Sequence, residues 1–151
     1  MRKSLFVAVV VLVVFSVSLW AFAGNIKSVG KLLEEAKKVV HEISVGEAYR
    51  EYYPKIGKGV VFIDVRSMDE VRKYGYIPGA ELIPRGFLEF AIGRLLPNGD
   101  EGITIVVYCQ TGKRSLLSAK TLKDMGYSRV LSMRGGFLKW RAKGYPVKHL
   151  P

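Results

Sequence analysis

The chain has 151 residues, a length that favours one domain, and 49% of them are hydrophobic, which is enough for a packed core. Its 24 Lys and Arg residues outnumber 13 Asp and Glu, so the formal net charge is +11. These cations are scattered, with no dense basic run and no nucleic-acid-binding motif. The composition therefore predicts a generally cationic solvated surface and no nucleic-acid partner.

The first 23 residues have the layout of a secretory signal peptide. Arg2 and Lys3 form a positive n-region, residues 5–20 are almost wholly apolar, and Ala21-Phe22-Ala23 is a small-x-small cleavage pattern. We therefore predict export to a periplasmic or otherwise extracytoplasmic location. The alternative is an uncleaved anchor facing the periplasm, because residues 5–23 approach the ~20 residues that a membrane span needs. A membrane partner is expected only in that case.

An N-terminal linker and helix are expected next, over residues 24–42, and the main domain over residues 43–151. Apolar residues at helical spacing predict a helix over residues 31–43. They are Leu32, Leu33, Ala36, Val39, Val40 and Ile43. Ser44 and Glu47 then form a Ser-x-x-Glu capping box, which predicts a second helix that ends before Pro54.

Strands alternate with helices in the rest of the chain. Continuous β-branched and aromatic runs at residues 60–65 and 103–108 predict two strands buried on both faces. Shorter strands are expected at residues 80–83 and 129–132. Helices are expected at residues 67–75, 84–96, 115–125 and 135–143, the first of them capped by Ser67 and Glu70. This alternation predicts an α/β fold, with helices on both faces of a parallel sheet.

Cys109 is the only cysteine of the chain, so it cannot form an intramolecular disulfide even in an oxidising compartment. An odd cysteine in an exported protein is a partner-linked thiol, a reactive thiol or a buried apolar residue. The chain has no Cys-x-x-Cys motif, and His41 and His149 lie far apart. We therefore expect no metal site and no cofactor.

The residues after Cys109 favour a reactive thiol. Cys109 ends an apolar run that we place centrally in the sheet, and ligands of such sheets bind beyond the carboxyl ends of the strands. The next residues open a helix, whose free N–H groups and dipole stabilise a negative charge, and Lys113 and Arg114 add two cations. These effects favour a thiolate, a persulfide or a bound anion. Gly112 allows the backbone to curl closely, and polar Gln110 and Thr111 argue against a continuation of the core.

Four motifs in order resemble the rhodanese family of sulfurtransferases, over residues of about 43 to 147. They are Ile63-Asp64-Val65-Arg66, Ile77-Pro78-Gly79-Ala80, Tyr108-Cys109-Gln110-Thr111-Gly112-Lys113-Arg114-Ser115, and Gly135-Gly136-Phe137 with Trp140. The resemblance implies a rhodanese-like open parallel sheet of about five strands.

The resemblance also implies a function. Cys109 would take a sulfane sulfur from a small sulfur-containing anion such as thiosulfate, hold it as a persulfide, and pass it to a thiophilic acceptor such as cyanide, or to a protein acceptor. The loop from Gln110 to Lys113 would cradle the sulfur. Arg114 would bind the donor anion or brace the loop, and Asp64 and Arg66 would brace it as a pair.

Arg85 has two interpretations. It follows the Pro-Gly-Ala turn and a short strand, so it could lie on the rim of the cysteine loop and bind an anionic donor. It could equally be a surface arginine paired with Glu89 at i, i+4, a pair worth about 0.2–0.5 kcal/mol.

Two other functions stay open. Cys109 to Arg114 is a Cys-x4-Arg loop, whereas related phosphatases and arsenate reductases have the longer Cys-x5-Arg loop, so its length favours sulfur transfer. A non-catalytic sulfur carrier is the other alternative. Two positions depart from the family pattern: Tyr76 stands where histidine is frequent, and Thr111 stands where the two-domain thiosulfate enzymes have lysine.

Overall fold

A computed structural model describes residues 26–151 of the chain. The predicted signal peptide, residues 1–23, lies outside the described residues. Residues Lys31–Pro151 form one compact unit. Within residues 26–151, no helix combines the length and the apolar character needed to cross a membrane.

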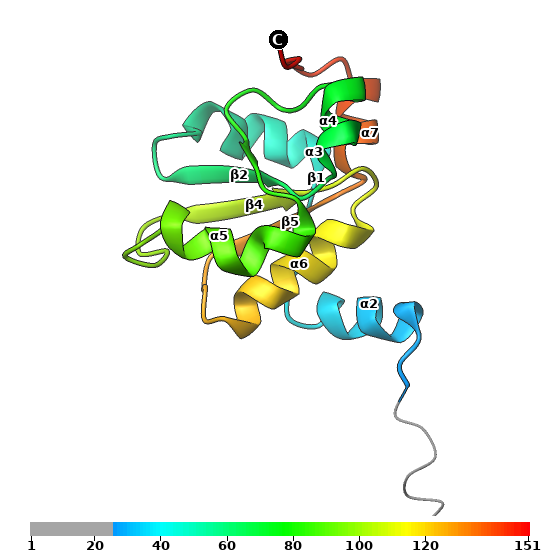
Figure 1. Ribbon diagram of the computed structural model, residues 1–151, viewed down its shortest axis with the longest axis vertical. Helices are drawn as coiled ribbons and strands as arrows, with labels where there is room; N and C mark the ends of the chain where they lie inside the picture. The colour runs from blue at the N-terminus through cyan, green and yellow to red at the C-terminus, as the bar shows by residue number, and fades with distance from the viewer. Residues whose placement is uncertain (1–25) are drawn as a thin grey trace, which may run out of the picture. The chain divides into compact units, whose positions relative to one another are not determined.

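The unit is built on one sheet of five parallel strands (Figure 1). The strands are β1 (His41–Ser44), β2 (Val60–Asp64), β3 (Glu81–Leu82), β4 (Thr104–Tyr108) and β5 (Val130–Arg134). Their order is β1-β5-β4-β2-β3, so β4 is the central strand. The predicted α/β class, the parallel sheet and the number of strands are confirmed. Because all strands run the same way, their carboxyl ends meet at one edge of the sheet.

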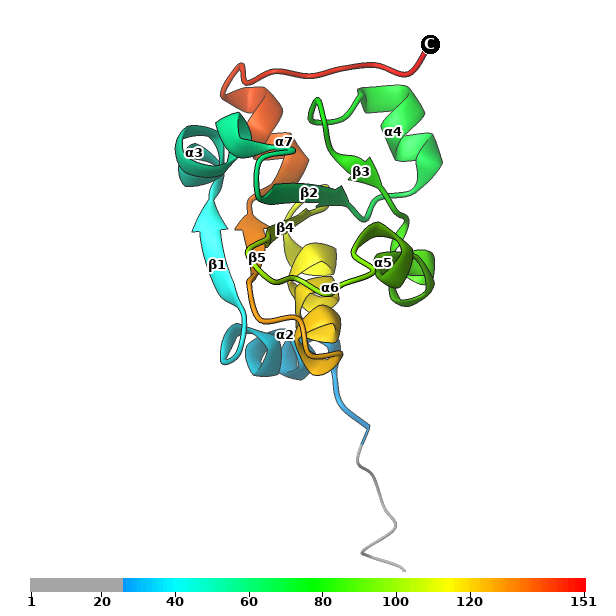
Figure 2. The ribbon, with the colours of Figure 1, turned by 90° about the vertical axis from the view of Figure 1, so that its left-hand side faces the viewer.

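Helices cover both faces of the sheet (Figure 2). One face carries α3 (Val45–Glu47), α4 (Met68–Tyr74) and α7 (Gly136–Ala142), and the other carries α2 (Val29–Lys37), α5 (Leu88–Leu95) and α6 (Lys113–Asp124). A π-helical turn (Ala48–Tyr52) and a 3₁₀ turn (Tyr53–Lys55) follow α3, and a second 3₁₀ turn (Arg85–Phe87) precedes α5.

Strand β4 contributes to a hydrophobic core on each side of the sheet. Ile105, Val107 and Cys109 pack in the core under α5 and α6, whereas Val106 and Tyr108 pack in the core under α7. This alternation follows from the period of two residues along a strand. Burial on both faces explains why the sequence of β4 is continuously apolar.

The two predicted capping boxes are present. The Ser44 hydroxyl accepts a hydrogen bond from the Glu47 N–H at 3.1 Å, and the Ser67 hydroxyl accepts one from the Glu70 N–H at 3.2 Å. They fix the starts of α3 and α4 directly after β1 and shortly after β2. The capping boxes therefore set where the chain turns back at the carboxyl edge of the sheet.

The prediction of one helix over residues 31–43 is wrong at its carboxyl end. Helix α2 ends at Lys37, a turn follows, and His41–Ser44 is strand β1, paired with β5. Val40 and Ile43 are buried as expected, but from a turn and a strand. A four-residue edge strand carries too few residues for its period of two to be distinguished from the helical period that precedes it.

Candidate active site

Cys109 lies directly after the last residue of the central strand, at the carboxyl edge of the sheet. Its thiol is free, and the residue is 1% exposed. The helix that follows begins at Lys113, two residues earlier than predicted, and Gly112 precedes it in the left-handed region with φ of 102°. Six residues from Cys109 to Arg114 therefore connect β4 to the first turn of α6.

The loop backbone turns toward the sulfur atom. The Gly112 N–H donates to Cys109 Sγ at 3.2 Å. A side chain at position 112 would be strained, because φ is positive and a Cβ atom would lie 3.0 Å from the Gly135 backbone nitrogen. The predicted role of Gly112 in closing the loop thus agrees with its geometry.

Three carbonyl groups of the loop accept hydrogen bonds from outside it, two of them from the beginning of α7 and one from α6. The Phe137 N–H donates to the Cys109 carbonyl oxygen at 2.8 Å, and the Leu138 N–H donates to the Gln110 carbonyl oxygen at 3.1 Å. The Ser115 hydroxyl donates to the Gly112 carbonyl oxygen at 3.0 Å. Because these three carbonyl oxygens are bound to outer donors, the loop can present N–H groups to its interior, as Gly112 does.

Gly136 is required for this contact between α7 and the loop. Its φ is 57°, and a Cβ atom there would lie 2.4 Å from the Cys109 carbonyl oxygen. We expect Gly136→Ala to lower the free energy of unfolding by about 1–3 kcal/mol more than Gly144→Ala, the cost of forcing atoms into a packed site. Gly144 is the matched control, because its φ is 71° but its Cβ would meet open space. Urea unfolding measures the stability of both variants. Equal losses of stability would mean that crowding of the Cys109 carbonyl oxygen by a Cβ atom at position 136 does not destabilise the protein.

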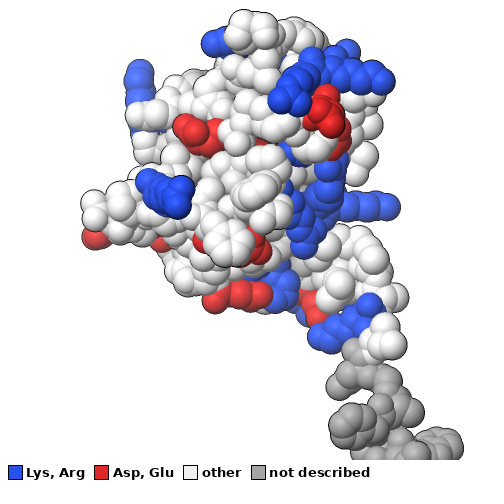
Figure 3. Space-filling model, in the orientation of Figure 1, with Lys and Arg blue, Asp and Glu red and all other residues white. Residues whose placement is uncertain are grey.

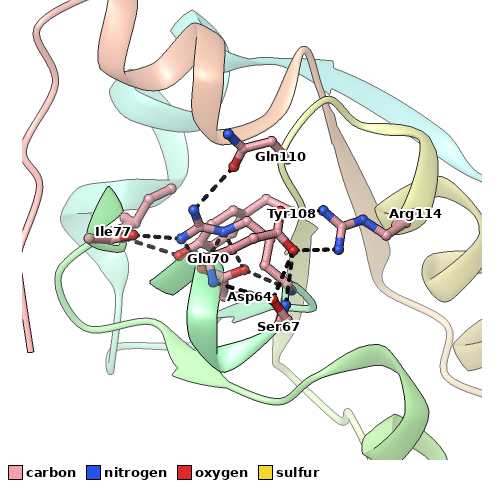
Figure 4. Close-up of polar contacts among 9 residues, drawn as sticks. Asp64, Ser67, Glu70, Ile77, Tyr108, Gln110 and Arg114 are labelled. Atoms are coloured by element: carbon pink, nitrogen blue, oxygen red, sulfur yellow. Dashed lines mark hydrogen bonds and ion pairs between the residues drawn. The ribbon is translucent and has the colours of Figure 1, made fainter. Parts of the chain in front are cut away.

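Arg114 is held by Glu70, which the sequence indicated only as a helix cap. Figure 4 shows the two side chains pointing toward each other from α6 and α4. Arg114 Nη1 and Nη2 bind the Glu70 carboxylate oxygens at 2.7 Å and 2.6 Å, a bidentate pair. The hydrogen bond from Arg114 lowers the Glu70 pKa from 4.5 to about 2, although burial opposes the shift. The same bond raises the Arg114 pKa, to which the nearby Cys109 sulfur adds less.

The Glu70–Arg114 pair predicts a stability that depends on pH. Because the folded-state pKa of Glu70 is lowered, its contribution is complete above pH 4.5 and is lost as the pH falls through about 2. The Arg114 side chain is 40% exposed, so we discount the contribution to about 1–2 kcal/mol. Glu70→Gln is expected to be less stable than the wild type by that amount at pH 7, with the difference shrinking below pH 4.5. Urea unfolding at several pH values tests this; a difference independent of pH contradicts it.

Asp64 and Arg66 form the predicted pair, and it is completely buried. Arg66 Nη2 lies 2.6 Å from Asp64 Oδ2, and both side chains are 0% exposed. Arg66 also donates to the Gly75 carbonyl oxygen at 2.7 Å and to Gln110 Oε1 at 3.2 Å. Its guanidinium lies 3.9 Å from the centre of the Phe137 ring. Arg66 therefore connects the end of β2 with the loop and with α7.

Tyr108 extends this buried polar group. Its hydroxyl accepts a hydrogen bond from the Ile77 N–H at 3.1 Å, which anchors the Ile-Pro-Gly-Ala turn (Figure 4). Burial, and secondarily the Asp64 charge, raise the Tyr108 pKa well above its ordinary value. Tyr108 stays protonated at any physiological pH, so its role here is structural.

A cavity of about 200 Å³ lies beside the loop. Thr111, Gly112 and Lys113 line it from the loop, and Arg134 lines it from the end of β5. Thr111 and Lys113 are exposed, while Gln110 is half-buried on Arg66. The predicted loop residues thus divide between the cavity and the support beneath the loop. Arg134 of β5 thus also lies at this site.

In the described part of the chain, no hydrogen bond or ion pair joins the Arg85 side chain to the loop. The Arg85 N–H donates to the Val65 carbonyl oxygen at 3.2 Å, which places its backbone near the end of β2. The alternative pairing with Glu89 is absent as well, since no ion pair joins the two side chains. Tyr76 pairs through its backbone with Lys148 at 2.8 and 2.9 Å. Within residues 26–151, no cluster of three or more His, Cys, Asp or Glu side chains could hold a metal ion.

Comparison with known proteins places this architecture in a family. The model of the rhodanese-like domain matches residues 49–143. A sulfurtransferase of Allochromatium vinosum is 32% identical over 88 residues, which are 58% of this chain and 78% of that protein. Thiosulfate sulfurtransferase 18 of Arabidopsis thaliana is 33% identical over 103 residues, covering 59% of this chain and 72% of that protein.

Solved structures agree with the fold. A protein of unknown function from Rhodopseudomonas palustris, described as a possible tyrosine phosphatase, superposes with a TM-score of 0.72 at 30% identity and covers 83% of this chain and 97% of its own. The polysulfide-sulfur transferase of Wolinella succinogenes superposes with a TM-score of 0.64 at 28% identity. The match covers 78% of this chain and 85% of that protein. With its five-stranded parallel sheet and the Cys109 loop after the central strand, the chain belongs to the rhodanese family.

Proposed function

We propose that the protein is a sulfurtransferase that carries a sulfane sulfur on Cys109. The observation that carries this proposal is the Cys109 Sγ atom at the end of β4, with the Gly112 N–H aimed at it from 3.2 Å. An N–H donor and the start of a helix stabilise negative charge on sulfur, whether on a thiolate or on the outer atom of a persulfide. The sulfurtransferase names of the relatives support the same chemistry.

The reaction balances in two steps, each a displacement at sulfur. The Cys109 thiolate attacks the outer sulfur of thiosulfate, the S–S bond of thiosulfate breaks, and sulfite leaves with the bonding electron pair. The persulfide on Cys109 then gives its outer sulfur to cyanide, which forms thiocyanate and restores the thiolate. The donor and the acceptor are both anions, which the cationic side chains of Lys113 and Arg134 beside the loop attract.

Phosphate-ester hydrolysis is the rival chemistry, because one structural neighbour is described as a possible tyrosine phosphatase. The Cys109–Arg114 loop has six residues, and Arg114 is turned to Glu70, which occupies both outer nitrogens of its guanidinium. Neither feature favours a bound phosphate. Purified protein is expected to form thiocyanate from thiosulfate and cyanide, and to leave an aryl phosphate intact. Hydrolysis of the aryl phosphate without thiocyanate formation would overturn the proposal.

A sulfur carrier that accepts sulfur only from a partner protein would give a third result. Cys109 is 1% exposed, so a partner would have to open the loop to reach it. Such a protein, isolated from cells, would carry one additional sulfur of about 32 Da while forming no thiocyanate. The mass of the isolated protein and the assay together separate this carrier from an enzyme.

We further propose that the protein acts outside the cytoplasm. The support is the sequence alone: Arg2 and Lys3, the apolar residues 5–20 and the Ala21-Phe22-Ala23 site. Periplasmic extracts of producing cells are expected to contain a chain that begins at Gly24. If the chain is found in the membrane with an intact amino terminus, it is anchored there, and if it is found in the cytoplasm, the proposal of export is wrong.

A further inference from the structure

A second cavity at the carboxyl edge of the sheet is strongly basic. It has a volume of about 290 Å³ and lies between the ends of β1 and β5 and the helices α3 and α7. Four of its eight lining residues are Lys or Arg, against 24 of 151 in the chain, and none is acidic. These four are Arg50, Arg134, Lys139 and Lys143. We call it the basic cavity.

The four cations have no anionic partner in the described part of the chain. None of their side chains takes part in the ion pairs or side-chain hydrogen bonds of residues 26–151. Glu47, which follows the lining residue Gly46 in the sequence, directs its carboxylate to the Ser44 N–H at 3.4 Å to complete the capping box. Like charges gathered in one cavity repel each other, so an anion bound among them would relieve that repulsion.

Two glycines make room for these side chains. A Cβ atom on Gly46 would lie 3.2 Å from Arg50 Nη1, and one on Gly135 would lie 2.7 Å from Lys139 Cδ. Arg50 and Lys139 therefore fold over glycine backbone toward the cavity. Tyr145 forms another wall and is fixed by stacking on Tyr49, with ring centroids 4.1 Å apart.

The sheet register places the basic cavity near the Cys109 loop. Ser44 and Arg134 are paired as the last residues of β1 and β5. Arg134 lines both the basic cavity and the cavity beside the loop. Figure 3 shows Lys and Arg side chains gathered on the side of the molecule where α6 begins in Figure 1.

We propose that the basic cavity binds a small oxyanion with two or more negative charges, of the size of a di- or triphosphate or a tricarboxylate. Its volume equals that of about ten water molecules, which exceeds the need of a single halide. Guanidinium and ammonium groups together match such an anion in charge and hydrogen bonding. The site is separate from the Cys109 thiol and does not depend on sulfur transfer.

The test is calorimetric titration of the purified protein with tripolyphosphate and with citrate in physiological salt. We expect one saturable equivalent for the wild type, and an affinity lower by about tenfold or more for Arg50→Gln/Lys143→Gln, because two charged donors are lost. Arg94→Gln/Lys58→Gln is the matched control: it removes the same charge from exposed positions outside the cavity, and its affinity should stay within about twofold. Equal losses of affinity in the two double variants would show that the net charge, and not the basic cavity, determines the binding.

Two-dimensional NMR locates the bound anion. Saturation with tripolyphosphate is expected to shift the amide signals of Gly46, Gly135 and Tyr145. Shifts confined to the loop around Thr111 would place the anion at the Cys109 loop and overturn the proposal. Absence of saturable binding at millimolar tripolyphosphate and citrate would overturn it as well. Neither result bears on thiocyanate formation, which is measured separately.

Discussion

Replacing Cys109 with serine is expected to lower thiosulfate-dependent thiocyanate formation by about 10³-fold or more. A serine hydroxyl is not ionised near neutral pH and cannot hold a sulfane sulfur as a persulfide. The substitution nearly preserves size at a buried position, so the fold and the Gly112 contact should persist. The assay compares initial rates of the wild type and the variant at saturating thiosulfate and cyanide.

Mass spectrometry gives the companion measurement for Cys109. Incubation with thiosulfate is expected to add one sulfur, about 32 Da, to the wild type and none to Cys109→Ser. Because Cys109 is the only cysteine, an adduct on the variant could not be a persulfide. Urea unfolding of both proteins controls for loss of structure. Equal rates of thiocyanate formation in the two proteins would contradict the assignment of Cys109 as the sulfur carrier.

The parts of the site that follow one another in the sequence could be predicted from it. The loop from Cys109 to Arg114 is continuous, and the strand before it is apolar over its whole length because both its faces are buried. The Asp64–Arg66 pair is separated by a single residue at the end of β2, so its members share one side of the chain. For residues this close in the sequence, the spacing along the strand or loop already determines how they lie relative to one another.

Contacts between distant segments could not be predicted in this way. Glu70 and Arg114 are 44 positions apart and meet only because α4 and the start of α6 both lie at the carboxyl edge of the sheet. The capping box already accounts for Glu70 in the sequence, so nothing there indicated its second role as the partner of Arg114. Arg134 reaches the loop only through the pairing of β5 with β4 and β1. Strand β1 was missed for the same reason, because pairing with β5 distinguishes it from a helix end.

Breaking the buried pair of Asp64 and Arg66 is expected to have the largest effect on stability. Arg66→Met leaves the Asp64 carboxylate at 0% exposure without its guanidinium, and Asp64→Asn leaves the guanidinium without its charge partner. An uncompensated buried charge lowers the free energy of unfolding by about 3–5 kcal/mol, a large fraction of the ~5–15 kcal/mol typical of a domain. Arg66→Met additionally removes the donors to Gly75 and Gln110, so it should be the more severe change.

Three further variants separate the buried charge from other effects of substitution. Asp64→Asn/Arg66→Met removes both charges and is expected to be more stable than the sum of the single losses predicts, since no charge remains unpaired. Arg72→Met and Asp69→Asn provide the surface control: their pair has a distance of 2.9 Å, but its side chains are 65% and 92% exposed. Each control should cost less than about 1 kcal/mol, because water screens exposed charges. Equal losses for the buried and the surface pair in urea unfolding would show that burial does not set the cost.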